Sequence, residues 1–390
     1  MEAVGKDMGP NLAMFGNNDR RAALVLTGGG ITGGVYELGV LCALDDFIVR
    51  GPRSGEFDHY VGISAGSMVA AFLANGVPVE ELSGAILGTG DAGLLLRRED
   101  IYSFRVSPFL RAAWEFLLHT PAILRHLRKT GQRVTILNAI SYLQEFLPPG
   151  VFTNDNLERY MSRALSAKGR SNDFRNLRRD LSIVAVEADS AERWIFGSGG
   201  VEEVPISKAI QASSAIPVFF EPVRIGDHHF IDGGAERVEH LDIALAGGAR
   251  LVLLINPTVP IANDRSSVCL PTLFGRCSSV AEFGFTMVAE QTFRINSRVK
   301  LELGVSLFRQ RYPGVDLLVI EPSPSESTLF LSGSMNFTER VQSLNFGYNS
   351  AARFFTERYD MLKDCFARHG RDVSLDGLRS NRFLDLAGFT

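Results

Sequence analysis

The sequence has few cysteines, no long apolar run and almost no net charge. Its four cysteines, Cys42, Cys269, Cys277 and Cys365, lie at no spacing typical of metal ligands. We expect the protein to work in a reducing compartment. No 18-residue stretch is apolar and free of charge, so a membrane-spanning helix is not expected. Forty Lys and Arg against 44 Asp and Glu give a net charge of -4, which supplies no general attraction for nucleic acid.

The N-terminal segment also lacks the apolar core of a secretory signal. Residues 1–20 are polar and rich in Gly and Asn, so we expect a flexible start to the chain. We therefore expect a cytoplasmic protein, with any membrane contact peripheral. With 390 residues, 45% of them hydrophobic, the chain can bury a sizeable core, and its size does not force oligomerisation.

Two segments of the chain read as strand, glycine-containing loop and helix. The first has an apolar strand at residues 22–26, the glycines Gly28 to Gly30, and helical spacing over residues 35–47. The second has a strand at residues 59–63 followed by a helix at residues 68–74. Further strands are predicted at residues 181–186, around residues 218–225, and at residues 251–255 and 316–320. Strands that alternate with helices predict an α/β fold with a mostly parallel central sheet.

A different stretch separates these units. Residues 79–180 are mostly helical in pattern, and we interpret them as an insertion on the core. Within them, the Arg97–Arg133 segment carries eight Lys or Arg and three acidic residues among aromatic and Leu residues, which makes it amphipathic and basic. A helical pair that packs on the sheet explains this pattern as well as a lid or membrane-contacting surface does.

The reactive chemistry is expected at Gly62-Ile63-Ser64-Ala65-Gly66, a G-x-S-x-G motif between a strand and a helix. At such a sharp turn the Ser64 hydroxyl projects above the strand ends, and Gly62 and Gly66 avoid collisions across the bend. The helix that follows directs N–H groups and its positive dipole end toward an anionic intermediate. An unreactive Gly/Ser turn is the alternative.

The glycine run Gly28-Gly29-Gly30-Ile31-Thr32-Gly33 fits two functions. It satisfies the G-x-G-x-x-G pattern of dinucleotide loops, but Asp45 and Asp46, at the required separation, end a helix instead of a strand. Consecutive glycines near a nucleophile also present bare N–H groups to an oxyanion. A tight turn without a chemical role is the third interpretation of this glycine run.

The base that would activate Ser64 is less obvious from the residues. None of His228, His229, His240 and His369 stands out, and the first two follow a predicted hairpin turn at residues 226–227. Asp232 lies at the end of a short apolar strand, before Gly233 and Gly234, which leave it uncrowded. An Asp-Gly turn without chemistry is the alternative.

Together these motifs resemble the patatin-like phospholipase family. The residues 28–33, 62–66 and 232–234 occur in the family's order, residues 211–217 resemble the run before its aspartate motif, and residues 337–353 resemble its closing helix. The resemblance implies a three-layer α/β fold with helices flanking the sheet. It also implies a lipid acyl hydrolase that needs no metal or other cofactor, with Ser64 as nucleophile and Asp232 as base. It further makes Gly28, Gly29 and Gly30 the oxyanion loop, supported by Gly33, Gly62, Gly66, Gly233 and Gly234.

The resemblance has two departures. Thr32 stands where the family commonly has Arg or Lys, so a positive charge that would contact the oxyanion loop or the lipid headgroup is missing at this position. Residues 235–240 read Ala-Glu-Arg-Val-Glu-His in place of the family's usual small apolar residue and Asn/Pro pattern. We expect a catalytic domain over residues 21–350 and a C-terminal helical extension over residues 351–390.

The reaction predicted on this basis is hydrolysis of phospholipid or lysophospholipid esters through an acyl-enzyme, with a phospholipid or other acyl lipid as partner and no nucleic acid. A soluble esterase or thioesterase with the same dyad, and a non-catalytic membrane-binding regulatory module, are the alternatives.

Overall fold

The computed structural model describes residues 20–91, 93–101, 103–104, 106–130, 135, 142, 146–237, 239–262, 279–323, 338–380 and 382–383. The flexible segment predicted over residues 1–20 falls almost entirely outside the described residues, as do Cys269 and Cys277. Parts of the Arg97–Arg133 segment, including Arg105 and Arg133, also lie outside them.

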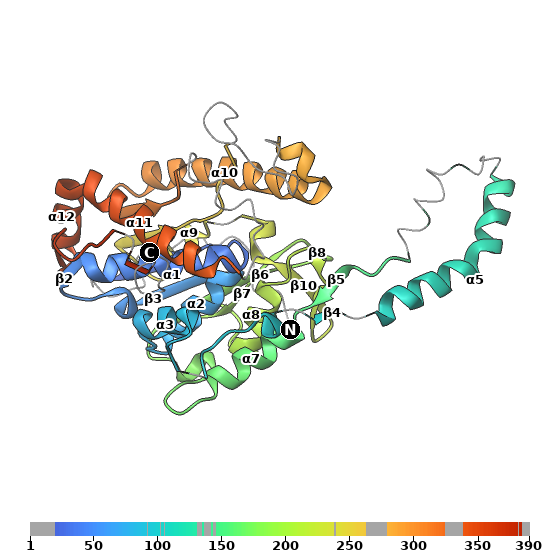
Figure 1. The fold of residues 1–390 in the computed structure, drawn as a ribbon, viewed down its shortest axis with the longest axis horizontal. Coiled ribbons are helices and arrows are strands. Elements are labelled where there is room, and N and C mark those ends of the chain that lie inside the picture. The colour runs from blue at the N-terminus through green and yellow to red at the C-terminus, as the bar shows by residue number, and fades with distance from the viewer. Residues whose placement is uncertain are drawn as a thin grey trace.

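The fold is a mostly parallel sheet flanked by helices, as predicted (Figure 1). Its strand order is β12-β11-β1-β3-β6-β10-β9, and β7 pairs with the edge of β6 opposite to β3 and β10. The pairs from β12 to β6 are parallel, whereas β10, β9 and β7 run antiparallel to their neighbours. The strands are β1 (Ala22–Leu26), β3 (His59–Ile63), β6 (Asp180–Glu187), β7 (Arg193–Gly197), β9 (Val223–Ile225), β10 (His228–Asp232), β11 (Leu251–Ile255) and β12 (Asp316–Ile320).

The predicted strands at residues 22–26, 59–63, 251–255 and 316–320 are confirmed, and that at residues 181–186 forms most of β6. The helices begin earlier than their apolar spacing indicated, because the loop glycines enter the first turn: α1 spans Gly30–Phe47 and α2 spans Ala65–Ala74. The strand predicted around residues 218–225 is two strands, β8 (Val218–Phe220) and β9, since Pro222 lies between them and cannot donate to a ladder.

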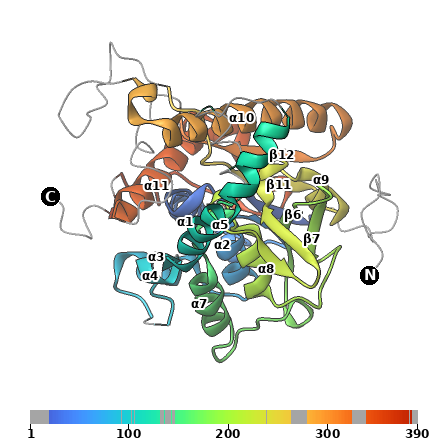
Figure 2. The same cartoon turned by 90° about the vertical axis from the view of Figure 1, so that its right-hand side faces the viewer.

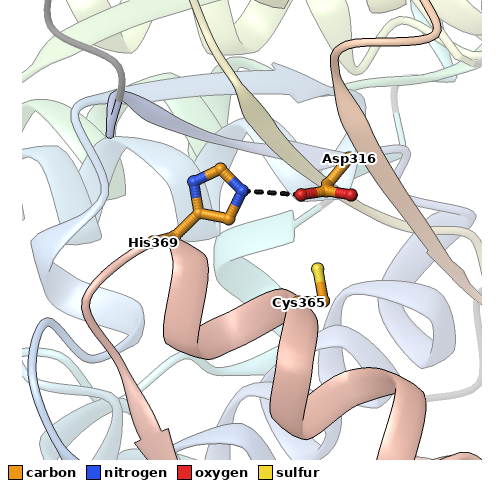
Figure 3. Close-up of side chains that lie close together, drawn as sticks. All are labelled: Asp316, Cys365 and His369. Atoms are coloured by element: carbon orange, nitrogen blue, oxygen red, sulfur yellow. Dashed lines mark hydrogen bonds and ion pairs between the residues drawn. The ribbon is translucent and has the colours of Figure 1, made fainter.

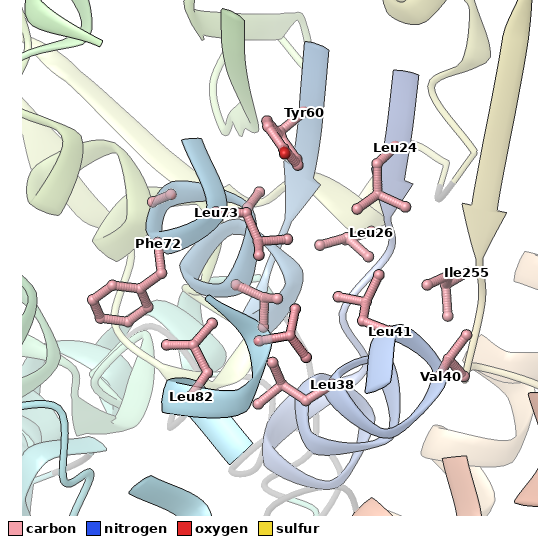
Figure 4. Close-up of a cluster of buried hydrophobic side chains, with 14 of the residues drawn as sticks. Leu24, Leu26, Leu38, Val40, Leu41, Tyr60, Phe72, Leu73, Leu82 and Ile255 are labelled. Carbon is pink, nitrogen blue, oxygen red and sulfur yellow. The ribbon is translucent and has the colours of Figure 1, made fainter. Parts of the chain in front are cut away.

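Alternate residues of the central strands face two separate apolar layers, as a pleated sheet requires. In β1, Leu24 and Leu26 pack with α1, α2, α3 (Val79–Leu87) and α11 (Arg340–Glu357), where Figure 4 shows them beside Leu41. Ala23 and Val25 pack on the opposite side with α9 (Leu241–Ala246) and α10 (Phe285–Arg311). Helices therefore cover both faces, which gives the three layers that the resemblance implied.

The rest of the chain adds short elements around this core. The predicted insertion contains α4 (Arg98–Ile101), α5 (Ser107–Lys129) and α7 (Asp155–Leu165), and its strands β4 (Ser103–Phe104) and β5 (Gly150–Thr153) form a small sheet with β8. Helix α5 projects away from the body (Figures 1 and 2). Helix α8 (Ile206–Ser213) precedes β8, and α12 (Tyr359–Arg368) and β13 (Asp372–Val373), which pairs with β2 (Ile48–Arg50), follow α11. The expected domain boundary near residue 350 falls inside α11.

Candidate active site

Ser64 occupies a strained turn between β3 and α2. Its backbone has φ 52° and ψ -132°, a left-handed conformation that a residue with a side chain rarely adopts. The bend brings the following helix close to β1, and a Cβ on Gly66 would overlap the carbonyl oxygen of Leu26. The strain and the close packing together are typical of a nucleophile elbow.

The glycine loop lies directly against this turn. Gly28, Gly29 and Gly30 all have positive φ, at 77°, 97° and 70°. A Cβ on Gly28 would lie 2.5 Å from the carbonyl oxygen of Ile63 and 2.9 Å from Cβ of Ser64. No larger residue fits at Gly28 without a shift of the Ser64 turn.

The three glycines differ in what their N–H groups do. The N–H of Gly28 donates to Oε1 of Glu37 at 2.7 Å, inside the protein. Burial raises the pKa of Glu37 well above its usual range, and hydrogen bonds from the backbone of Gly28 and Thr27 oppose that rise only in part. Within the described part of the chain, the N–H groups of Gly29 and Gly30 donate to no residue. The sequence pattern did not single out Glu37.

Asp232 ends β10 and is buried beside the elbow. Its Oδ1 accepts a hydrogen bond from the N–H of Gly234 at 2.8 Å. Its Oδ2 has no hydrogen-bond partner of ordinary geometry among the described residues, but the Ser64 side chain is close enough to act on the carboxylate and lower its pKa. Burial has the larger effect and raises the pKa of Asp232 from 3.8 to about 6. The structure thus brings the Ser64 and Asp232 side chains together.

The sheet register explains how residues so far apart in sequence meet. Ser64 follows Ile63, which pairs with Val184 of β6, while Asp232 pairs with Ala185, the next residue of β6. Because β7 pairs with the other edge of β6 at both positions, β3 and β10 share one edge, and their C-terminal ends meet end to end there. This arrangement places Ser64 next to Asp232.

The end of α8 connects both residues. The N–H of Ser64 donates to Oγ of Ser213 at 2.9 Å, and the N–H of Asp232 donates to the carbonyl oxygen of Ala215 at 3.0 Å. Ser213 is fully buried, so this hydrogen bond is shielded from water. The residues 211–217 were identified only by resemblance, and their pattern alone did not indicate this bridging role.

A cavity of about 100 Å³ adjoins Ser64 on the α1 and α2 side of the sheet. Its surface is almost entirely apolar, and the exceptions include the hydroxyls of Ser64 and Ser214. Oγ of Ser214 is buried and forms no hydrogen bond with any described residue. The apolar lining comes from α1, α2, α3, α7 and β8 and includes Ile31, Val35, Leu38, Met68, Phe72, Leu82, Ile86, Leu157, Ile216 and Phe220.

The candidate histidines have other contacts. His240 is buried behind the aspartate loop, with Nε2 3.4 Å from the carbonyl oxygen of Gly233 and Nδ1 3.3 Å from Arg193. Burial lowers the pKa of His240 to about 3, so its ring is neutral. The predicted hairpin at residues 226–227 is confirmed between β9 and β10, and His228 and His229, which follow the turn as expected, begin β10.

A second polar cluster lies at the opposite edge of the sheet, where β12 begins. Asp316, Cys365 and His369 offer ligand atoms within 4.8 Å of one another (Figure 3). Oδ2 of Asp316 is 2.8 Å from Nε2 of His369, and Arg368 donates to the same carboxylate at 2.8 and 3.3 Å. Because Arg368 already compensates the carboxylate charge, we interpret this cluster as a clamp that joins α12 to the sheet, and not as a metal centre.

The departures from the family pattern are also visible. Thr32, at the position where a basic residue is common, lies in the first turn of α1 and is buried. After the short helix η4 (Gly233–Ala235), Arg237 pairs with Asp242, which also binds Arg193. Among the described helices, none combines the length and apolar character needed to cross a membrane.

Comparison with known proteins finds a matching family and two similar chains. A family model described as patatin-like phospholipase matches residues 24–245, more than half of the chain. The uncharacterized protein YqhO of Bacillus subtilis (strain 168) is 22% identical over 227 residues, which are 54% of this chain and 62% of YqhO, so the match spans less than two thirds of that relative. The crystal structure of VipD from Legionella pneumophila matches with 17% identity and a TM-score of 0.38, over 87% of this chain and 67% of VipD.

Proposed function

Because the chain belongs to the patatin-like phospholipase family, which supports a lipid acyl hydrolase, we propose that it cleaves phospholipid or lysophospholipid esters through Ser64 and Asp232. The observation that carries this proposal is the position of the Ser64 hydroxyl, between the buried Asp232 carboxylate and an apolar cavity. An acyl chain needs such an apolar cavity, and its ester carbonyl then lies at the serine.

In the proposed reaction Asp232 removes the proton from the Ser64 hydroxyl as the serine oxygen attacks the ester carbonyl. The tetrahedral intermediate collapses and the C–O bond to the alcohol breaks. Asp232 first gives its proton to the leaving alcohol and then takes a proton from water, which attacks the acyl-enzyme. As the bond between the acyl carbon and the Ser64 oxygen breaks, Asp232 returns this proton to Ser64 and the fatty acid is released. The raised pKa of Asp232 makes it a stronger base than an ordinary aspartate.

We assign the oxyanion contacts to the N–H groups of Gly29 and Gly30, since that of Gly28 is occupied by Glu37. Both groups lie at the N-terminal end of α1, where the helix dipole favours negative charge. The hydrogen bond to Glu37 then fixes the Gly28 end of the loop. Because Gly28 has no Cβ, the loop can lie against the Ser64 turn.

Membrane contact is assigned to the Arg97–Arg133 segment, as a peripheral attachment. In α5, Leu110, Trp114, Leu117 and Leu118 are each more than half exposed and lie on one face of the helix. Arg125, Arg128 and Lys129 follow toward its C-terminal end. Exposed apolar side chains beside basic ones favour insertion into an anionic lipid surface.

Hydrolysis of a defined phospholipid and lysophospholipid panel tests the chemistry, with wild type, Ser64→Ala and Asp232→Asn compared. We expect both variants to lose at least 10³-fold in kcat, and an acyl-fluorophosphonate to label wild type at Ser64. Equal activity in all three proteins would refute the dyad.

Two alternatives are separated by substrate form. A soluble esterase or thioesterase would hydrolyse short monomeric esters without a rate increase on anionic vesicles. A non-catalytic membrane-binding module would show neither labelling at Ser64 nor hydrolysis. A non-catalytic module leaves the apolar cavity at Ser64 unexplained, whereas a soluble esterase would use the same cavity, so the vesicle comparison decides between the two enzymes.

A further inference from the structure

Helix α10 carries large apolar side chains on two opposite faces. One face packs on the sheet, where Leu301 and Phe308 join the buried layer. The opposite face carries large apolar side chains that are 43% to 81% exposed: Phe285, Val288, Ile295, Val299, Leu303 and Leu307. A helix that covers a sheet normally presents polar residues outward, so this outer face is suited to a further partner.

The exposed apolar residues follow the spacing of a helix-pairing seam. From Phe285 the steps to Val288, Thr292, Ile295 and Val299 are three, four, three and four residues. This alternation of three and four keeps one narrow stripe facing a second helix. Leu303 and Leu307 extend the stripe at four-residue steps, and the other residues along it, Asn296, Ser306 and Gln310, are uncharged.

The stripe is long and lies on the outside of the molecule. From Phe285 to Leu307 it extends about 33 Å, at 1.5 Å per residue. In Figures 1 and 2 α10 runs along the upper edge of the molecule, so a second helix can approach it. At about 10 Å wide, the stripe covers roughly 300 Å², a size at which apolar patches mark interaction sites.

We propose that this outer face of α10 pairs with α10 of a second copy of the chain, with the two helices antiparallel. An antiparallel pair related by a two-fold axis between residues 293 and 294 sets Val288 opposite Val299 of the other copy and Thr292 opposite Ile295, and it brings Phe285 beside Leu303, one position from exact register. The valines then meet each other, Phe285 meets Leu303 and Thr292 meets Ile295, so the stripe from Phe285 to Leu303 is complementary to itself.

Charge favours the antiparallel direction. The C-terminal end of α10 carries Arg309 and Arg311, and the N-terminal end follows Glu282. A parallel pair would bring the arginines of both copies together, whereas an antiparallel pair sets them near the acidic end of the other helix. The helix dipoles also oppose each other in this direction.

One helix pair is a small interface, so we expect a dimer with a dissociation constant on the order of micromolar. Light scattering coupled to size-exclusion chromatography of the full chain, over about 1 to 100 µM, should show a shift from monomer to dimer. The double variant Val299→Glu/Leu303→Glu should remain monomeric at every concentration. Val49→Glu, an exposed apolar residue on β2, is the matched control and should dimerise like wild type.

Disulfide trapping tests the register. In a Cys269→Ser/Cys277→Ser background, a mixture of Val288→Cys and Val299→Cys proteins should cross-link under mild oxidation, and Val288→Cys alone should not. Cross-linking of Val288→Cys with itself would overturn the antiparallel register. A wild type that is monomeric at 100 µM, or a glutamate double variant that still dimerises, would overturn the pairing. Monomers that bind vesicles through this face would instead assign it to lipid. None of these measurements depends on catalysis.

Discussion

The backbone N–H of Ser64 donates to the side-chain oxygen of Ser213 at 2.9 Å, in the buried space between α2 and α8. Because Ser64 has a strained backbone, this contact helps to hold the turn in the conformation that faces Asp232. Ala215, two residues later, binds the backbone of Asp232, so one short segment sets the position of both side chains.

Replacement of Ser213 by Ala should therefore lower kcat by about 10- to 100-fold with little change in KM, since a small misplacement of reacting groups has effects of that size. Steady-state kinetics on a soluble ester, together with thermal unfolding, measures this. Ser350→Ala, which also removes a buried serine hydroxyl, is the control and should affect stability without a loss of kcat. Equal kinetic effects at both positions would contradict a positioning role for Ser213.

Gly28→Ala should abolish hydrolysis, because the new Cβ would collide with the Ser64 turn. Gly76 has nearly the same backbone angle, φ 78° against 77°, but a Cβ there meets nothing within 4 Å. Gly76→Ala should therefore cost only the backbone strain, about 1–2 kcal/mol of unfolding free energy, and leave the rate unchanged. Comparable activities of the two variants would show that the loop does not need to contact Ser64.

Glu37→Leu should reduce the rate by about 10- to 100-fold by releasing the N–H of Gly28, while Glu37→Gln should retain most activity because its amide oxygen still accepts that hydrogen bond. Covalent labelling by a fluorophosphonate also depends on this loop but needs no membrane-bound substrate. Its rate should therefore fall in the same order among the variants. If the glutamine variant is as slow as the leucine variant, the carboxyl group itself is required, and positioning is not its role.

The raised pKa of Asp232, about 6, predicts both a rate profile and a stability effect. As a base it must be ionised, so kcat/KM should fall as pH decreases through about 6. Because the folded protein binds this proton more tightly than the unfolded chain does, its stabilising effect is complete below about pH 4 and lost as pH rises through 6, by about 3 kcal/mol. Asp232→Asn should therefore have a higher Tm than wild type at pH 8 but not at pH 4. A lower Tm at pH 8 would contradict the buried, unpaired carboxylate.

The double variant Trp114→Ala/Leu117→Ala should bind anionic vesicles about 100-fold more weakly, since each buried apolar side chain contributes about 1.5–3 kcal/mol. Its rate on a short soluble ester should not change, because α5 projects from the body. Val49→Ala/Met361→Ala removes two exposed apolar side chains elsewhere and should bind vesicles like wild type. Sedimentation with vesicles gives the comparison.

The sequence predicted the parallel strands and the motif positions because both depend on local pattern. The buried strand at residues 22–26 and the turn at Ser64 are recognisable from neighbouring residues alone. Strands β8 and β9 were merged, because only tertiary pairing assigns the first of them to a different sheet. Glu37 and Ser213 were missed for a related reason: each acts on a residue that only the folded chain brings near, with Ser213 149 positions from Ser64.

The pairing of β10 with β6 also has a consequence for folding. Successive residues of a strand point to opposite sides, so a slip of one position in this antiparallel ladder would turn the Asp232 carboxylate away from Ser64. A misaligned hairpin could keep most of the core and still be inert. Hydrolytic activity therefore reports correct strand alignment at this edge more strictly than a spectroscopic measure of folded content would.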